Sequence, residues 1–235
     1  MGGTALNQHD LMVHVLIDAG GRAAESAVPS GYRGRVADVL FAEDDVIVEV
    51  KSLTTDRAND PEVGQAVGEM FAKSTHLGAP VVFGTVAVNL HDLDPRVAAN
   101  TLRIVGRRVQ DVTKSANDQI KKTKVALDRP NALGVVVLIT PPFKFDRKSI
   151  VWTMGDVMRD GRCSGIDLVF LVETPLAAPE PDAHRVDSFL SMHSRADRGL
   201  PNHLVEAIDQ AWGRVTGQLG VRADDEDFNK YGATS

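Results

Sequence analysis

The stretch of sequence that decides the fold is residues 36–51, which read VADVLFAEDDVIVEVK. Two β-rich runs on either side of an acidic centre predict a β-hairpin. Side chains alternate along a strand, so Glu49 and Lys51 share one face of the second run. A loop of two or four residues places Asp38 of the first run directly opposite Glu49, whereas an odd-numbered loop without a bulge separates them. Alternation also puts Ala37 on the face opposite Asp38, with Val39 and Phe41.

Two carboxylates held side by side across a hairpin repel each other unless a cation lies between them. Oxygen ligands favour Mg²⁺ or Mn²⁺, which leave coordination positions open for water and a substrate phosphate. The ammonium of Lys51 points to the same place, where it can orient the attacking water or neutralise charge on the phosphoryl oxygens. These residues predict metal-dependent phosphodiester hydrolysis, with Asp38 and Glu49 as the metal ligands. The alternative is an edge hairpin whose charges prevent pairing with another strand.

Hydrophobic spacing predicts the elements around this hairpin. Helices are expected at residues 9–19, 60–78, 94–127 and 204–219. Buried strands are expected at residues 80–88, 134–140 and 166–172. The pattern around Trp152 predicts no element. The expected fold class is α/β, a central mixed β-sheet flanked by helices in one domain over residues 1–220, with an acidic, disordered tail at 221–235.

The pair Ala37-Asp38 and the triplet Glu49-Val50-Lys51 resemble the two acidic elements of the PD-(D/E)xK nucleases. That family includes restriction endonucleases, junction resolvases and DNA repair exonucleases. Ala37 stands at the position of the proline in the family's name, and this position varies among members. The common core of the family runs helix, three strands, helix, strand, and the predicted order of elements in residues 9–90 is similar.

The resemblance implies a restriction-endonuclease-like core at residues 9–90, which residues 91–220 extend with a long basic helix and extra strands. Family members often add a glutamate near the first helix and a glutamine from the second helix, and Glu25 and Gln65 are the candidates here. The implied activity is Mg²⁺- or Mn²⁺-dependent endo- or exonucleolytic cleavage of DNA, in a homodimer where both strands are cut. Cleavage of RNA is an open alternative, as is an inactive nuclease-like fold that binds nucleic acid or another protein.

Positive charge gathers in the predicted long helix, although the chain has a formal net charge of -6. Residues 96–129 hold nine Lys or Arg and three acidic residues. Such a helix can follow a phosphate backbone, because Lys and Arg contacts release counterions, or it can simply present a solvated face. The candidate DNA contacts are Arg103, Arg107, Arg108, Lys114, Lys121 and Lys122.

Other classes of site have no support in the sequence. The single cysteine, Cys163, excludes an intramolecular disulfide, and the seven scattered histidines lack zinc-site spacing and are interpreted as structural. No phosphate-binding P-loop and no Gly-x-Ser-x-Gly motif is present. No run of about 18 apolar residues and no secretory signal pattern is present, so a cytoplasmic protein without membrane association is expected.

Overall fold

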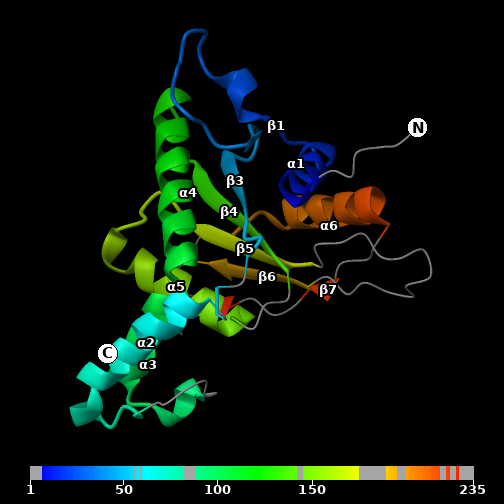
Figure 1. Cartoon of the computed structure of the whole chain (residues 1–235). Coiled ribbons are helices and arrows are strands. Elements are labelled where there is room, and N and C mark those ends of the chain that lie inside the picture. The colour runs from blue at the N-terminus through cyan, green and yellow to red at the C-terminus, as the bar shows by residue number, and fades with distance from the viewer. Residues whose placement is uncertain are drawn as a thin grey trace.

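The structure is a computed structural model in which one mixed β-sheet lies between two layers of helices (Figure 1). This arrangement confirms the α/β class and the central mixed sheet flanked by helices. The structure describes residues 7–55, 57–58, 60–81, 88–141, 145–174, 189–194, 199–217, 221–222 and 226–227.

The described strands are β1 (Arg22–Ala23), β2 (Val39–Phe41), β3 (Val46–Ser52), β4 (Leu133–Thr140), β5 (Leu168–Glu173), β6 (Phe189–Ser194), β7 (Val221–Arg222) and β8 (Glu226–Asp227). They lie in the order β1-β2-β3-β4-β5-β6, and both β7 and β8 pair with β6. The first three strands form an antiparallel meander, and β3, β4 and β5 run parallel to one another. β6 is antiparallel to β5. The hairpin that carries the candidate residues therefore ends in a strand, β3, that is paired on both sides.

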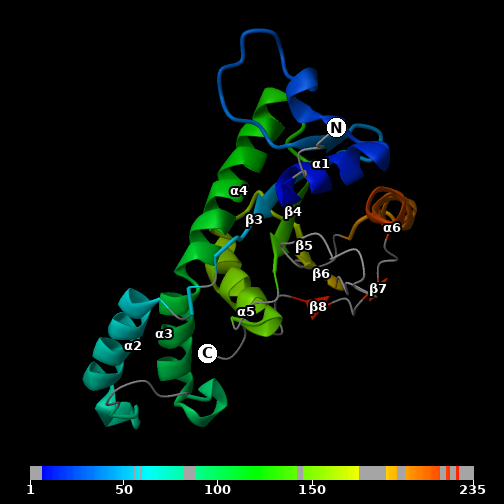
Figure 2. The ribbon, with the colours of Figure 1, turned by 45° about the vertical axis from the view of Figure 1, so that its right-hand side comes forward.

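The described helices are α1 (Gln8–Asp18), α2 (Pro61–Lys73), α3 (Pro95–Val105), α4 (Arg107–Ala126), α5 (Arg147–Met158) and α6 (Asn202–Thr216). Short 3-10 turns are η1 (Ala24–Ala27), η2 (Thr75–Leu77), η3 (Leu90–Asp92) and η4 (Arg159–Gly161). α1 and α6 cover one face of the sheet, and α4 and α5 cover the other. α2 and α3 pack against each other around Phe71 and Val97 and project from this sandwich (Figure 2).

The predicted hairpin forms with a loop of four residues, 42–45. Val39 lies opposite Val48, and the carboxylate of Asp38, the residue before it, interacts with the carboxyl of Glu49. The even-numbered loop satisfies the condition under which the two carboxylates face each other. The prediction of adjacent Asp38 and Glu49 is therefore confirmed.

The side chains of β3 alternate as predicted, with its valines packed toward α1 and α6 and Ile47 packed toward α4. The prediction for Ala37 is wrong, because Ala37 packs with Ile47 on the α4 side and not with Val39. Regular pairing begins only at Val39. The Asp38 N–H donates to the carbonyl of Val48 (3.1 Å), one residue out of register, and this shift turns Ala37 to the other face.

The helix expected at residues 94–127 is two helices, α3 and α4, that meet at Gly106. The backbone turns there, since Gly106 has a ψ of 7° instead of a helical value. Gly106 also lies directly against α5. A Cβ atom at this position would be 2.6 Å from Oγ1 of Thr153, so a glycine is needed where the chain passes α5.

The order of elements expected for residues 9–90 differs from the structure after β3. α2 follows β3, but it packs on α3 and not on the sheet. Most of the strand expected at 80–88 lies outside the described residues, and Pro80, Val81 and Val88 are not in a strand. The strand that pairs in parallel with β3 is β4, and α4 packs over β3 on the face that carries Ile47.

The remaining predicted elements lie close to their expected positions. β4 and β5 confirm the two buried strands beyond residue 133, and α1 and α6 confirm the first and last helices. The unassigned segment around Trp152 is α5. Four residues of the expected disordered tail, 221–222 and 226–227, form β7 and β8 against β6. Among the helices of the described residues, none has both the length and the apolar composition needed to cross a bilayer.

Candidate active site

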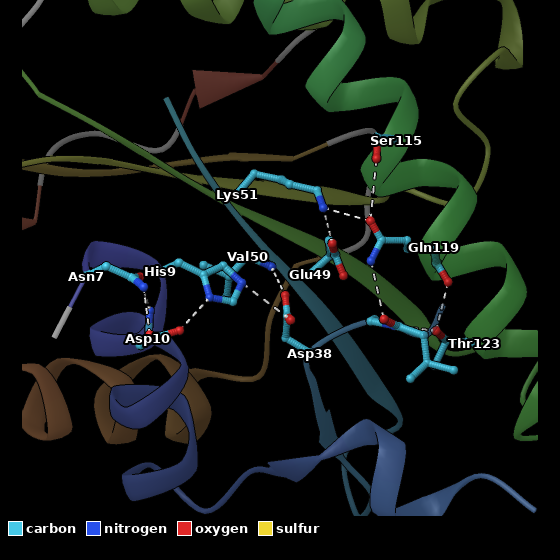
Figure 3. Close-up of polar contacts among 12 residues, drawn as sticks. Asn7, His9, Asp10, Asp38, Glu49, Val50, Lys51, Ser115, Gln119 and Thr123 are labelled. Atoms are coloured by element: carbon cyan, nitrogen blue, oxygen red, sulfur yellow. Dashed lines mark hydrogen bonds and ion pairs between the residues drawn. The ribbon is translucent and has the colours of Figure 1, made fainter. Parts of the chain in front are cut away.

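Asp38 lies where β2 begins, and its carboxylate takes part in the pairing of the hairpin (Figure 3). Its Oδ2 accepts a hydrogen bond from the backbone N–H of Val50 (2.8 Å). A carboxylate oxygen therefore replaces the backbone carbonyl that would accept this bond in a regular ladder. This bond fixes the Asp38 carboxylate at the edge of β3, next to Glu49.

Glu49 is the buried carboxyl of the site, with 1% of its surface exposed. Lys51 Nζ donates to Oε1 of Glu49, whereas Oε2 has no hydrogen-bond partner among the described residues. Burial, followed by the negative charge of Asp38, raises the pKa of Glu49 to about 8, against the opposing effect of the Lys51 hydrogen bond. A buried oxygen without a partner is unfavourable, so this arrangement has room for a cation or a proton.

Lys51 is held between β3 and α4. Its Nζ donates to Glu49 and also to Oε1 of Gln119 (2.7 Å). Gln119 in turn donates from Nε2 to the carbonyl of Val36 (3.3 Å), and Ser115 Oγ lies 3.5 Å from its Oε1 (Figure 3). A glutamine of α4 thus orients the lysine and ties it to the start of the hairpin.

The glutamine beside the site is Gln119 and not Gln65. Gln65 is exposed on α2, where its Nε2 donates to Oε1 of Glu69 (2.9 Å), and α2 does not cover the sheet. The resemblance implied a glutamine on the second helix of the sequence, which is α2. The helix that covers the sheet beside β3 is α4. The polar row Arg108, Ser115 and Gln119, at intervals of seven and four residues along α4, was the signal that could have identified it.

A histidine that no sequence pattern singled out also reaches the site. His9 lies in the first turn of α1, with Nε2 3.5 Å from Oδ1 of Asp38 and Nδ1 3.1 Å from Oδ1 of Asp10. The side chain of Asn7 caps this helix by accepting from the N–H of Asp10 (2.9 Å). His9 therefore borders Asp38 (Figure 3), and its interpretation as a structural residue stays a prediction.

An open cleft of about 670 Å³ lies beside Lys51, between the start of α1, the end of β3 and α4. Lys51 and His9 form part of its wall, whereas Asp38 and Glu49 are not among the residues that line it. The residues that line it are Asn7, Gln8, His9, Val50, Lys51, Ser52, Thr54, Arg108, Asp111, Val112 and Ser115. Its volume is that of a small-ligand site, which typically measures about 300–1,000 Å³.

Glu25 is exposed in the 3-10 turn η1, directly after β1. No hydrogen bond or ion pair between described residues joins it to Asp38, Glu49 or Lys51. Glu25 therefore lies outside the contacts that form the site. The residue before it, Ala24, donates its backbone N–H to the carbonyl of Asp38 (3.0 Å).

The six basic candidates for DNA contact divide into three groups. Arg103 is paired through Nε and Nη2 with the carboxylate of Asp156 (both 2.9 Å) and stacks on Trp152, so it stabilises the contact between α3 and α5. Arg108 lines the cleft. The others are exposed on α4, where Arg107, Lys114 and Lys121 recur every seven residues along one side, away from the cleft, and Lys122 lies nearer to it.

The donor groups fit a divalent cation only in part. Within the described residues no cluster of three or more His, Cys, Asp or Glu side chains is arranged to hold a metal ion. Asp38 and Glu49 nevertheless offer two adjacent carboxylates, one of them with a free buried oxygen. One or two carboxylates are enough for Mg²⁺, which keeps several waters and binds substrate phosphate. The pair therefore fits Mg²⁺ or Mn²⁺ with water in the remaining positions.

The arrangement can do three things chemically: bind a cation through two carboxylates, present an ammonium to an anion in the cleft, and receive a phosphate near Arg108. Comparisons with protein-family models, with curated proteins and with solved structures found no match to this chain.

Proposed function

We propose that this protein is a metal-dependent nuclease that hydrolyses DNA phosphodiester bonds at Asp38, Glu49 and Lys51. The observation that carries the proposal is the unpartnered Oε2 of Glu49, buried beside the Asp38 carboxylate. Lys51 contacts only one oxygen of Glu49, and the nearby Asp38 carboxylate adds a second negative charge. A divalent cation would compensate both carboxylates.

The topology supports the same interpretation. The order implied by the resemblance, helix, three strands, helix, strand, describes α1, β1, β2, β3, α4 and β4. Residues 53–106, which contain α2 and α3, are then an insertion between the hairpin and the helix that covers it. On this assignment α4 covers β3, and the end of β3 and one side of α4 line the cleft together with the start of α1.

In the proposed mechanism Asp38 and Glu49 would hold the metal ion, which would supply positive charge for the phosphate and for the activation of water. Lys51 projects from the same face of β3 and orients the attacking water or stabilises charge on the phosphoryl oxygens. Gln119 keeps the Lys51 ammonium at the border of the cleft. Arg108 offers a second positive charge for the substrate backbone.

A second candidate is a nuclease-like fold that binds nucleic acid or a protein without catalysis. The favouring observation is that the Lys51 ammonium already contacts Glu49 and Gln119, so this network is closed without a metal. RNA remains an alternative substrate, because the same three groups would cleave either backbone. A homodimer would supply two such sites for cutting both strands.

The test is incubation of supercoiled plasmid with the purified chain in Mg²⁺ or Mn²⁺, with EDTA as the metal-free control. Nicking or linearisation is expected for the natural sequence, and a loss of at least about 100-fold for Lys51→Ala and Glu49→Gln, since oxyanion-stabilising and metal-binding groups are worth that much. Lys148→Ala, which removes an exposed lysine of α5, is the matched control and should cleave normally. Intact plasmid in every lane, with either metal, would favour the binding module instead.

A further inference from the structure

A basic loop leads from η1 into Asp38. Its residues 29–35 are all exposed, and it projects past one end of α4 (Figures 1 and 2). The N–H of Tyr32 closes a turn on the carbonyl of Pro29 (3.2 Å), and Gly31 adopts a left-handed φ of 99°. The loop thus has a defined turn at its tip.

The base of this loop is fixed to the same helix that holds Lys51. Gln119 Nε2 donates to the carbonyl of Val36 (3.3 Å), and the N–H of Ala37 donates to Oγ1 of Thr123 (2.7 Å). Gln119 is therefore shared by the lysine and the loop. Arg35 precedes Asp38 by three residues, a separation of at most about 10 Å along the chain.

Tyr32 is an exposed aromatic residue with a fixed orientation. The side chain is 38% exposed, and its ring lies over the backbone of Gly34. A Cβ atom added at Gly34 would be 2.6 Å from Cζ and 2.8 Å from Cε1 of the tyrosine. A Cβ atom at this position would displace the ring, so Gly34 allows the ring to lie where it does.

The two arginines of the loop are free to bind anions. Arg33 and Arg35 are exposed, and neither forms an ion pair with a described residue. By contrast, Arg129 is paired with Asp45 (2.8 Å) and Arg103 with Asp156 (2.9 Å). Two unpaired cations beside an exposed ring are the combination that binds a nucleic-acid strand, with phosphates on the arginines and a base on the ring.

We propose that residues 29–35 bind single-stranded DNA next to the site, with Tyr32 stacked on an unpaired base and Arg33 and Arg35 on phosphates. This inference rests on the proposed function and specifies its substrate. Stacking on Tyr32 requires a base that is not paired. The cleft of about 670 Å³ beside Lys51 has the volume of a small-ligand site.

The path of the strand follows α4. Arg108 lines the cleft toward the start of this helix, and Thr123 anchors the loop near its end. Fifteen residues at about 1.5 Å each separate them by about 22 Å. Lys51 lies between, at Gln119. A single strand that lies along this flank touches Arg108, passes the Asp38–Glu49 pair and reaches the loop.

The experiment measures fluorescence anisotropy of a fluorescein-labelled 20-nucleotide single strand, and of the matching duplex, with the full chain in EDTA. Cleavage of the same oligonucleotides in Mn²⁺ is followed in parallel. The variants are Tyr32→Ala, Tyr32→Phe, Gly34→Ala and the double variant Arg33→Ala/Arg35→Ala, with Lys148→Ala as the control for a lost surface charge. Thermal melting establishes that each variant is folded.

We expect the natural chain to bind the single strand more tightly than the duplex. Tyr32→Ala should weaken this binding about tenfold, since stacking of one base on an aromatic ring is worth that much, and Tyr32→Phe should retain it. Gly34→Ala should act like Tyr32→Ala, because it displaces the ring without removing it. The double arginine variant should reduce the dependence of log K on log salt by about 1.4, or 0.7 for each phosphate.

The outcomes separate this inference from the proposed nuclease function. Normal cleavage, together with single-strand binding that stays within twofold in all loop variants, would contradict the role of the loop. The proposed nuclease function would still stand. Preference for the duplex would also overturn it. If the natural chain binds the single strand without cleaving it, and the loop variants lose this binding, the role of the loop is supported and the proposed nuclease function is rejected. A chain that neither binds nor cuts would reject both.

Discussion

Replacement of Glu49 by glutamine should stabilise the metal-free protein at alkaline pH, and the effect should disappear in acid. The amide keeps the shape of the side chain and an acceptor for Lys51 Nζ, but it carries no charge to bury. The prediction follows from the raised pKa of Glu49, whose first cause is burial and whose second is the charge of Asp38.

The magnitude follows from linkage. The usual pKa of this carboxyl is 4.5, and in the folded protein it is about 8. Below pH 4.5 both folded and unfolded chains are protonated at Glu49. Between the two values only the unfolded chain loses this proton, so stability falls as pH rises. At about 1.4 kcal/mol for each pH unit, the loss is on the order of 3 to 5 kcal/mol by pH 8.

The assay is urea denaturation of the natural chain and Glu49→Gln in EDTA at several pH values from 5 to 8.5. The quantity compared is the difference in unfolding free energy between the two proteins, which cancels the other titrating groups. It should grow in favour of the variant by several kcal/mol, and Mn²⁺ at pH 8 should stabilise only the natural chain. Glu206→Gln, an exposed change on α6, controls for the loss of surface charge. A difference that stays within about 0.5 kcal/mol across this range would refute the burial argument.

Three further predictions concern the same region. Gln119→Ala should lower the cleavage rate about tenfold because Lys51 loses an acceptor, whereas Gln65→Ala should leave it unchanged; equal effects in the plasmid assay would contradict the placement of α4. Gly106→Ala should destabilise the fold by about 1 to 3 kcal/mol in thermal melting, and Thr153→Ala should restore only part of this, because the added Cβ would still lie 2.7 Å from the backbone carbonyl of Leu102; no rescue at all would contradict the close approach to Thr153. Mn²⁺ should bind up to about tenfold more tightly for each pH unit gained below pH 8, since Glu49 must lose its proton; calorimetry at pH 6.5 and 7.5 that shows no difference would contradict this.

The hairpin was predictable because every relation in it is local. The alternation of Glu49 with its apolar neighbours and the even-numbered loop depend on residues within 16 positions of one another. The prediction of which face the Ala37 side chain occupies was wrong because of contacts that are distant in the sequence. The N–H of Ala37 bonds to Thr123, 86 residues away, and the Asp38 carboxylate replaces a ladder carbonyl, so alternation fails at the first residues of the strand.

The supporting residues of the site could not be predicted in the same way. The second helix in the sequence, α2, has the capping signals and apolar face of a helix that packs on a sheet, yet it packs on α3. Both α2 and α4 are amphipathic, so this property does not decide which of them covers β3, and only the polar row along α4 distinguishes the two helices. Which helix covers β3 depends on the path of the chain between β3 and β4. For this reason the glutamine that contacts Lys51 is Gln119 of α4 and not Gln65 of α2.

The residues of the hairpin and the glutamine of α4 differ in what their replacement can reveal about function. The groups with the chemistry, Asp38, Glu49 and Lys51, come from one hairpin and would lie together in any fold that keeps it. Charged residues on an edge hairpin are common, so their proximity alone does not distinguish a catalytic site from a protected edge. β3, however, is paired on both sides and buried, and α4 supplies a glutamine aimed at the lysine. A protected edge needs no such partner, and for this reason the effect of Gln119→Ala on cleavage is the more discriminating measurement.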